Sequence, residues 1–150
     1  MTYLEKKATQ YEQGKDIVPF LPYYLGCLII VTYPVEGENE QYYDEEELEL
    51  LSFEDMDYFA GFPLKLVLRK FENSRAEDKK WLEEYCIKAN SLFPSNENMA
   101  DIVKYFCDRG IDMFNLVEKG LAVEFDFNIL KEKFPHKEKL ISNYMLSLDN

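Results

Sequence analysis

Histidine is nearly absent from this chain, because His136 is the single one among 150 residues. Any Ser-His-Asp or Cys-His mechanism would have to use that imidazole. It directly follows Pro135 and lies among Lys133, Lys137 and Lys139, a setting typical of the exposed start of a helix. We expect His136 to be a surface residue and the protein not to be an enzyme.

Cysteine is also scarce. Cys27, Cys86 and Cys107 are odd in number, far apart and set among apolar residues, as is typical of buried thiols in a reducing compartment. The sequence has no Cys-x-x-Cys pair and no glycine-rich phosphate loop, which argues against a zinc site and against nucleotide binding. Asp55 and Asp57 form an Asp-x-Asp pair of the kind that can hold Mg²⁺ or Ca²⁺. So acidic a segment contains such a pair by chance, and we expect neither a metal nor another cofactor.

Long apolar runs are missing too. The longest, residues 25–31, is far shorter than the ~20 residues of a membrane-spanning helix. The first seven residues lack the apolar core of a secretory signal. These absences predict a cytoplasmic protein without membrane contact. The 47% hydrophobic and 15% aromatic content predicts a folded chain, and its length fits one domain, residues 1–150.

Basic residues are missing between Lys15 and Lys65, and this absence is the most informative one. Residues 16–64, the acidic window, hold twelve carboxylates, whereas the rest of the chain carries seventeen acids and seventeen bases. The net charge of −12 therefore arises entirely in this window. Without a basic concentration, the chain is not expected to bind nucleic acid directly or to adsorb to an anionic membrane.

Two interpretations of the acidic window remain open. Asp44–Glu47 could form the first turn of a helix, where carboxylates favour the positive end of the helix dipole, or be a solvated face. Self-repulsion within a patch of one sign favours a compensating role instead, such as steering a basic partner. Tyr42 and Tyr43 fall in a polar loop of the same window and suit an interface, because Tyr is enriched at hot spots. Core packing is the alternative for both tyrosines.

The pattern of apolar residues predicts an α+β fold, with a small, about three-stranded sheet packed by several helices and a helix-rich C-terminal half. The expected strands lie at 25–33, 64–71 and 121–127. The expected helices lie at 2–13, 52–61, 74–92, 97–109, 112–119 and 128–148, the last interrupted by Pro135. Residues 44–51 are assigned to a helix with a strand as the alternative, and two prolines predict extended chain at 17–22. Phe53 and Phe59 are assigned to the core, and Met99 to the apolar stripe of its helix.

In size, acidity and tyrosine content the chain resembles toxin-immunity proteins and phage proteins that disable host nucleases. We therefore expect a protein-binding inhibitor that neutralises a basic partner, such as a nuclease-type toxin or a defence protein, by occluding its functional surface. The alternatives are a small enzyme with a carboxylate-based divalent-metal site and an acidic chaperone of a secreted effector. The residues predicted to bind the partner are Glu36, Glu38, Tyr42, Tyr43, Asp44, Glu45, Glu46, Asp55 and Asp57.

Overall fold

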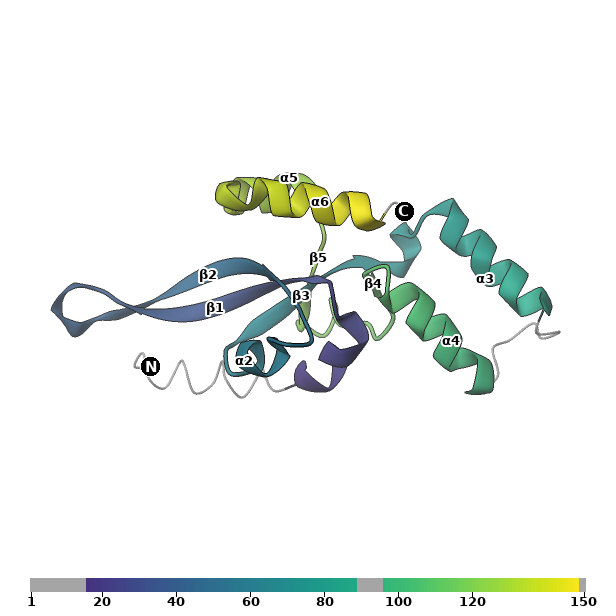
Figure 1. Cartoon of the computed structure of the whole chain (residues 1–150), viewed down its shortest axis with the longest axis horizontal. Coiled ribbons are helices and arrows are strands. Elements are labelled where there is room, and N and C mark those ends of the chain that lie inside the picture. Colours follow the sequence, from purple (N-terminus) through teal and green to yellow (C-terminus); the bar gives the residue numbers. More distant parts are fainter. Residues whose placement is uncertain (1–15, 89–95, 149–150) are drawn as a thin grey trace.

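The computed structural model describes residues 16–88 and 96–148, which form the predicted α+β fold (Figure 1). The helix expected at 2–13 lies outside the described residues. The described strands make one mixed sheet of five, in the order β2-β1-β3-β4 with β5 also paired to β3, rather than about three. They are β1 (Leu28–Glu36), β2 (Tyr42–Leu50), β3 (Leu64–Lys70), β4 (Ile111–Asp112) and β5 (Ala122–Glu124).

The first two strands form an antiparallel hairpin with nine residue pairs, from Leu28↔Leu50 to Glu36↔Tyr42. The strand β3 pairs with only three of these β1 residues, Ile29 to Val31. The outer half of the hairpin is therefore a two-stranded ribbon, which projects from the body at the left of Figure 1.

Pro34 does not end β1, although proline removes a strand N–H. The Thr32 N–H donates to the Pro63 carbonyl on the β3 side of the strand. Because successive residues alternate, the nitrogen of Pro34 points to the same side, beyond the first residue of β3. No ladder bond is lost there, as for proline on other strand edges.

The helix assigned to 44–51 is wrong, and the alternative, a strand, is right. Leu48 lies opposite Ile30 and is fully buried, whereas its neighbours Glu47 and Glu49 are half-buried at the edge of the sheet. The alternation of Leu48 and Leu50 with glutamates fits a pleated strand. Pairing with the buried strand β1 therefore overrides the helical preference of a glutamate run.

Helices cover both faces of the sheet (Figure 1). One face carries α5 (Phe127–Lys133), the 3₁₀ turn η4 (Pro135–Lys137) and α6 (Glu138–Leu148). The other face carries the 3₁₀ helix η1 (Val18–Tyr24) and α2 (Met56–Ala60). Because successive strand residues point to opposite faces, the sheet contributes to a hydrophobic core on each side. The core under α5 and α6 contains Leu28, Ile30, Leu48 and Val67. The core on the other face contains Ile29, Val31, Leu66 and Leu68, together with Leu21, Tyr24 and Phe59.

The helices α3 (Ala76–Lys88) and α4 (Asn96–Cys107) lie at the end of the molecule opposite the hairpin. They correspond to the helices predicted at 74–92 and 97–109. A stack of flat groups joins them. The Tyr105 ring lies 3.7 Å from the Trp81 ring on one side and 3.6 Å from the Arg109 guanidinium on the other. The Tyr105 hydroxyl also donates to the buried Asp78 carboxylate, at 3.1 Å.

Several local predictions are wrong. Residues 17–22 are not extended chain: Ile17 caps the 3₁₀ helix η1 and residues 18–22 belong to it, with Ile17 and Leu21 buried and Pro19 in the first turn. Residues 112–119 do not form a helix: Asp112 ends β4 and bends and turns follow it. Asn115 has a φ of 60°, which a right-handed helix cannot contain, and the Asp112 carboxylate accepts the N–H groups of the residues that follow. Met99, assigned to an apolar stripe, is exposed.

Candidate protein-binding surface

The ribbon beyond β3, residues 33–45, is here called the arm. Glu36, Glu38 and Glu45 are exposed on it, and Tyr42 and Tyr43 keep 50% and 52% of their surface in solvent. Both tyrosines lie in β2, opposite Glu36 and Val35, and not in the predicted loop. Since neighbouring strand residues point to opposite faces, the two rings lie on opposite faces of the arm.

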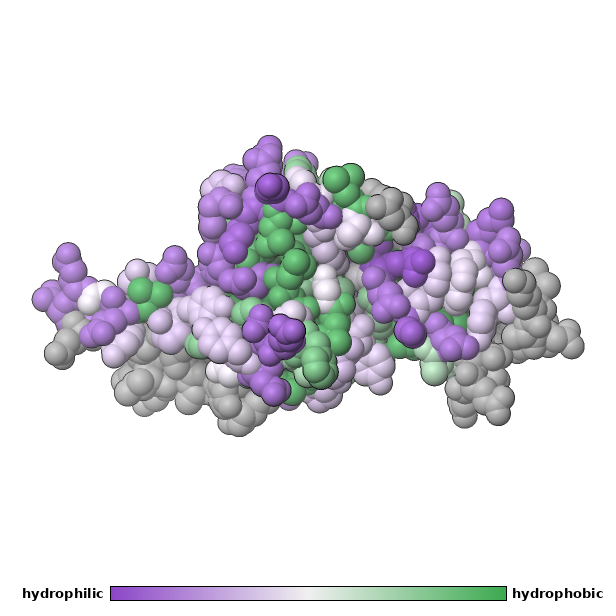
Figure 2. Space-filling view, viewed as in Figure 1, coloured by the Kyte–Doolittle hydropathy of each residue, from purple (hydrophilic) through white to green (hydrophobic). Residues whose placement is uncertain are grey.

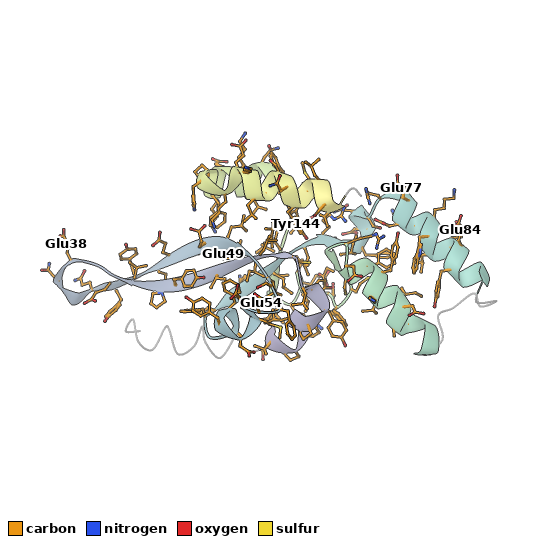
Figure 3. All side chains as sticks on the ribbon, viewed as in Figure 1. Glu38, Glu49, Glu54, Glu77, Glu84 and Tyr144 are labelled. Carbon is orange, nitrogen blue, oxygen red and sulfur yellow. The ribbon has the colours of Figure 1, made fainter. Side chains whose placement is uncertain are left out.

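The tip of the arm is a tight turn. The Gly37 N–H donates to the Gln41 carbonyl at 2.6 Å, and the short 3₁₀ turn η2 (Glu38–Glu40) lies between them. A Cβ at Gly37 would lie 3.3 Å from the Gln41 carbonyl oxygen and 3.4 Å from the Tyr43 ring, so the turn leaves little room for a side chain at this position. The turn thereby positions Glu38 at the extreme end of the molecule, as Figure 3 shows.

Nearer the body, β2 carboxylates are paired within the chain. Lys133 Nζ donates to Glu46 at 2.7 Å, His136 Nε2 lies 2.9 Å from both carboxylate oxygens of Glu47, and Lys137 lies 4.0 Å from Glu49. All three partners come from α5 and η4. The base-rich C-terminal segment therefore neutralises part of the acidic window, and Glu46 is not an unpaired carboxylate.

Of these three carboxylates, Glu47 has the most hydrogen-bond partners. Besides His136, it accepts the N–H of Leu48 at 3.0 Å, a backbone group that points outward from the edge strand. Partial burial raises the pKa of Glu47, but the hydrogen bonds from His136 and Leu48 and the charges of His136 and Lys137 outweigh it and lower the pKa below its ordinary value. His136 is exposed, as predicted, and its contact with Glu47 could not be foreseen from local sequence.

Asp55 and Asp57 lie elsewhere. Asp55 directly precedes α2 and Asp57 lies in its first turn, on the body of the molecule, whereas Glu38 lies at the far end of the arm (Figure 3 labels Glu54 and Glu38). The nine predicted residues thus divide into a group of seven on the hairpin and this pair beside α2. Asp44 is half-buried on the arm, while Asp55 and Asp57 are exposed.

Phe53, predicted to be a core residue, is 75% exposed, whereas Phe59 is buried as predicted. The turn before α2 explains the difference. Ser52 Oγ accepts the N–H of Asp55 at 3.2 Å and donates to its carboxylate at 3.1 Å, which leaves the residues between them on the outside of the turn.

Sequence reasoning missed an aromatic contact that braces the arm. Phe62 packs edge-on against Tyr33 at 4.9 Å and against Tyr58 at 5.3 Å. Burial, together with Glu49, Tyr58 and Glu47, raises the pKa of Tyr33 to about 12, so its hydroxyl is neutral at physiological pH. The contact joins the base of the arm to the segment that precedes β3.

The described residues offer little for catalysis. No group of three or more His, Cys, Asp or Glu side chains among them is arranged to hold a metal ion. A hollow of about 390 Å³ lies between β1, β3 and α5, and the Glu46 carboxylate on its wall is bound by Lys133. Cys27 and Cys107 are buried, and burial raises the pKa of Cys27 to about 12 and that of Cys107 to about 11, which keeps both thiols protonated.

Comparison of the chain with protein-family models, curated proteins and solved structures gave no match. Within the described part of the chain, every helix is too short or too polar to cross a membrane.

Proposed function

We propose that this protein binds and neutralises a basic partner protein, of the toxin-immunity or anti-defence type, and that the arm makes the first contact. The observation that supports this proposal most is the position of the unpaired charge. Glu36, Glu38 and Glu45 lie on a ribbon that projects beyond the rest of the sheet. In the described residues, none of the three has a lysine or arginine at ion-pair distance.

A projecting acidic ribbon suits the occlusion of a basic cleft. Two-stranded ribbons bury little apolar surface, so they contribute little to the stability of the domain that carries them. A surface of one sign accelerates encounter with a surface of the opposite sign. Nuclease active sites are basic because they bind phosphates, and a narrow ribbon can enter such a cleft. Tyr42 and Tyr43 would supply the desolvated contact area on either face of the ribbon.

The test compares two charge reversals of equal size. The first variant carries Glu38→Lys and Glu45→Lys on the arm, and its matched control carries Glu83→Lys and Glu84→Lys on the exposed face of α3. The wild type and both variants are used to capture proteins from the native host at low salt, and the retained basic protein is identified by mass spectrometry. Its association rate with all three baits is then measured at several salt concentrations.

We expect the arm variant to associate at least tenfold more slowly than the control, with a weaker dependence on salt. The proposal fails if the arm variant retains the wild-type rate and salt dependence. It also fails if the captured protein is acidic, or if both double variants lose binding equally, because only the total charge would then matter.

A further inference from the structure

A second exposed feature lies where β2 ends, away from the arm. Phe53 is the most exposed large apolar side chain of the described residues, and Leu25 and Leu50 nearby are 39% and 41% exposed. Two backbone hydrogen bonds hold their segments together: the Gly26 N–H donates to the Leu51 carbonyl, and the Leu51 N–H donates to the Cys27 carbonyl. Leu25, Leu50 and Phe53 are here called the Phe53 patch.

Figure 2 shows an apolar strip that crosses the middle of the molecule, between the polar hairpin and the polar surface of α3 and α4. Single exposed apolar residues are normal on protein surfaces, but several of them on neighbouring segments beside charged residues are typical of a binding site. The Ser52–Asp55 hydrogen bonds fix the turn that carries Phe53. A partner would therefore meet an aromatic side chain on an already ordered turn, which lowers the entropy lost on binding.

The charge next to the Phe53 patch indicates what could cover it. Glu54, Asp55 and Asp57 follow Phe53 directly in the chain and are exposed. Within the described residues they have no lysine or arginine at ion-pair distance. A second copy of this chain would place like charges against them, which is unfavourable. A segment with an apolar stripe and flanking cations complements both the apolar and the acidic part.

We infer that the Phe53 patch docks a basic amphipathic helix of the partner protein. Apolar residues at helical spacing contact Leu25, Leu50 and Phe53, and lysines or arginines at the margin of the stripe meet Glu54, Asp55 and Asp57. The inference rests on the proposed function for the basic character of the partner. It differs from that function in its residues, because the arm steers the partner by charge and the Phe53 patch holds it by burial of apolar surface.

The probe is a synthetic helical peptide of about five turns, made of leucine and lysine, with the leucines on one face. A control peptide of the same composition has its leucines spread around the helix. Binding to the full chain is measured by fluorescence anisotropy, and the contacted residues are mapped from changes in the backbone amide NMR spectrum. The variant is Phe53→Ser, and its matched control is Ile129→Ser on α5, a residue that is 62% exposed. Both side chains are exposed, so both variants should keep the fold.

We expect the striped peptide to bind at least tenfold more tightly than the spread one and to shift amide signals around residues 25, 50 and 53. Phe53→Ser should weaken its binding at least tenfold, as for a hot-spot residue, and Ile129→Ser should not. No binding to the wild type, equal binding of the two peptides, or binding unaffected by Phe53→Ser would each overturn the inference.

The arm variant separates this inference from the proposed function. If Phe53→Ser loses the peptide while Glu38→Lys with Glu45→Lys still slows association of the captured partner, both stand. If only the arm variant affects partner binding and the peptide ignores Phe53, the Phe53 patch is overturned and the proposed function stands. If Phe53→Ser weakens binding of the peptide and of the partner while the arm variant changes neither, the role of the arm fails and the Phe53 patch stands.

Discussion

The two halves of β2 differ in how their charge is compensated, although glutamate dominates both. Toward the body, Glu46, Glu47 and Glu49 contact Lys133, His136 and Lys137 of α5 and η4. Toward the tip, Glu45 has no such partner among the described residues, and the hairpin there extends beyond the end of β3. Glutamates of the same strand therefore form ion pairs or hydrogen bonds within the chain in one half, whereas Glu45 in the other half is exposed and has no lysine or arginine at ion-pair distance among the described residues.

The comparison also revises the meaning of the acidic window. A stretch without basic residues suggested a single negatively charged surface. Three of its glutamates, however, contact Lys133, His136 and Lys137, which lie about 90 residues further along the chain. Glu36, Glu38 and Glu45 on the arm and Glu54, Asp55 and Asp57 beside Phe53 remain without a lysine or arginine at ion-pair distance in the described residues. A steering surface needs this unpaired set, because a paired carboxylate contributes little to the long-range field.

The largest effect should come from the apolar residue that anchors the paired half. Leu48 is fully buried between the sheet and α5 and α6, so Leu48→Ala should lower the free energy of unfolding by about 3 kcal/mol, through lost burial and a residual cavity. On the arm, Tyr43→Ala should cost less than about 1 kcal/mol, because half of its surface is already in solvent. Urea unfolding of both variants measures the contrast, and equal losses would contradict the division of β2 into two halves.

The next effect concerns Glu47, the carboxylate with most partners. Glu47→Gln removes the charge that His136 and the Leu48 N–H stabilise, and should lower the free energy of unfolding by about 1 kcal/mol at neutral pH. Glu45→Gln, two residues nearer the tip, should change it by less than about 0.5 kcal/mol. Urea unfolding at pH 7 compares them, and equal effects would show that pairing does not distinguish these glutamates.

The same pair should differ in pH dependence. Because folding lowers the pKa of Glu47, its carboxylate stabilises the fold above the pKa of the unfolded chain, and this contribution is lost as the pH falls through the lower folded value. The difference in unfolding free energy between wild type and Glu47→Gln should therefore be complete above about pH 5 and shrink below about pH 4. A difference that grows on acidification would mean that the pKa of Glu47 is raised on folding, contrary to its contacts.

Much of this fold could be predicted from local patterns. The strand β3 and the helices α4 and α6 follow from alternation, from a stripe of apolar residues and from Gly110, which has a positive φ beyond the end of α4. The strand β2 was only the alternative assignment because four consecutive acids resemble a helix start, whereas the strand depends on nine pairs with β1. The alternation of Leu48 and Leu50 was the one local signal for it, and it was too short to decide.

The candidate surface was predictable in composition but not in geometry. The acids and tyrosines of the window could be named, and most of them are exposed. Which acids are paired depends on contacts between β2 and η4, and such distant contacts leave no trace in a local pattern. Phe53 was assigned to the core because large aromatic residues are usually buried, whereas the Ser52–Asp55 turn exposes it. Its exposure follows from hydrogen bonds of the turn and not from its own character.

The smallest expected effect tests how far pairing extends along β2. Lys133 lies 2.7 Å from Glu46 and Lys137 lies 4.0 Å from Glu49, and all four side chains are partly exposed. Exposed pairs contribute roughly 0.2–1 kcal/mol, and less when the distance is long or the salt concentration is high. Lys133→Ala should therefore cost about 0.5 kcal/mol and Lys137→Ala close to nothing, with both differences vanishing in about 1 M salt. Thermal unfolding at low and high salt measures both.

Lys137→Ala could instead cost as much as Lys133→Ala, with a loss that persists in salt. The aliphatic chain of Lys137 would then stabilise the fold by packing against β2 and not by its charge, and the part of β2 whose carboxylates are paired would end at Glu47.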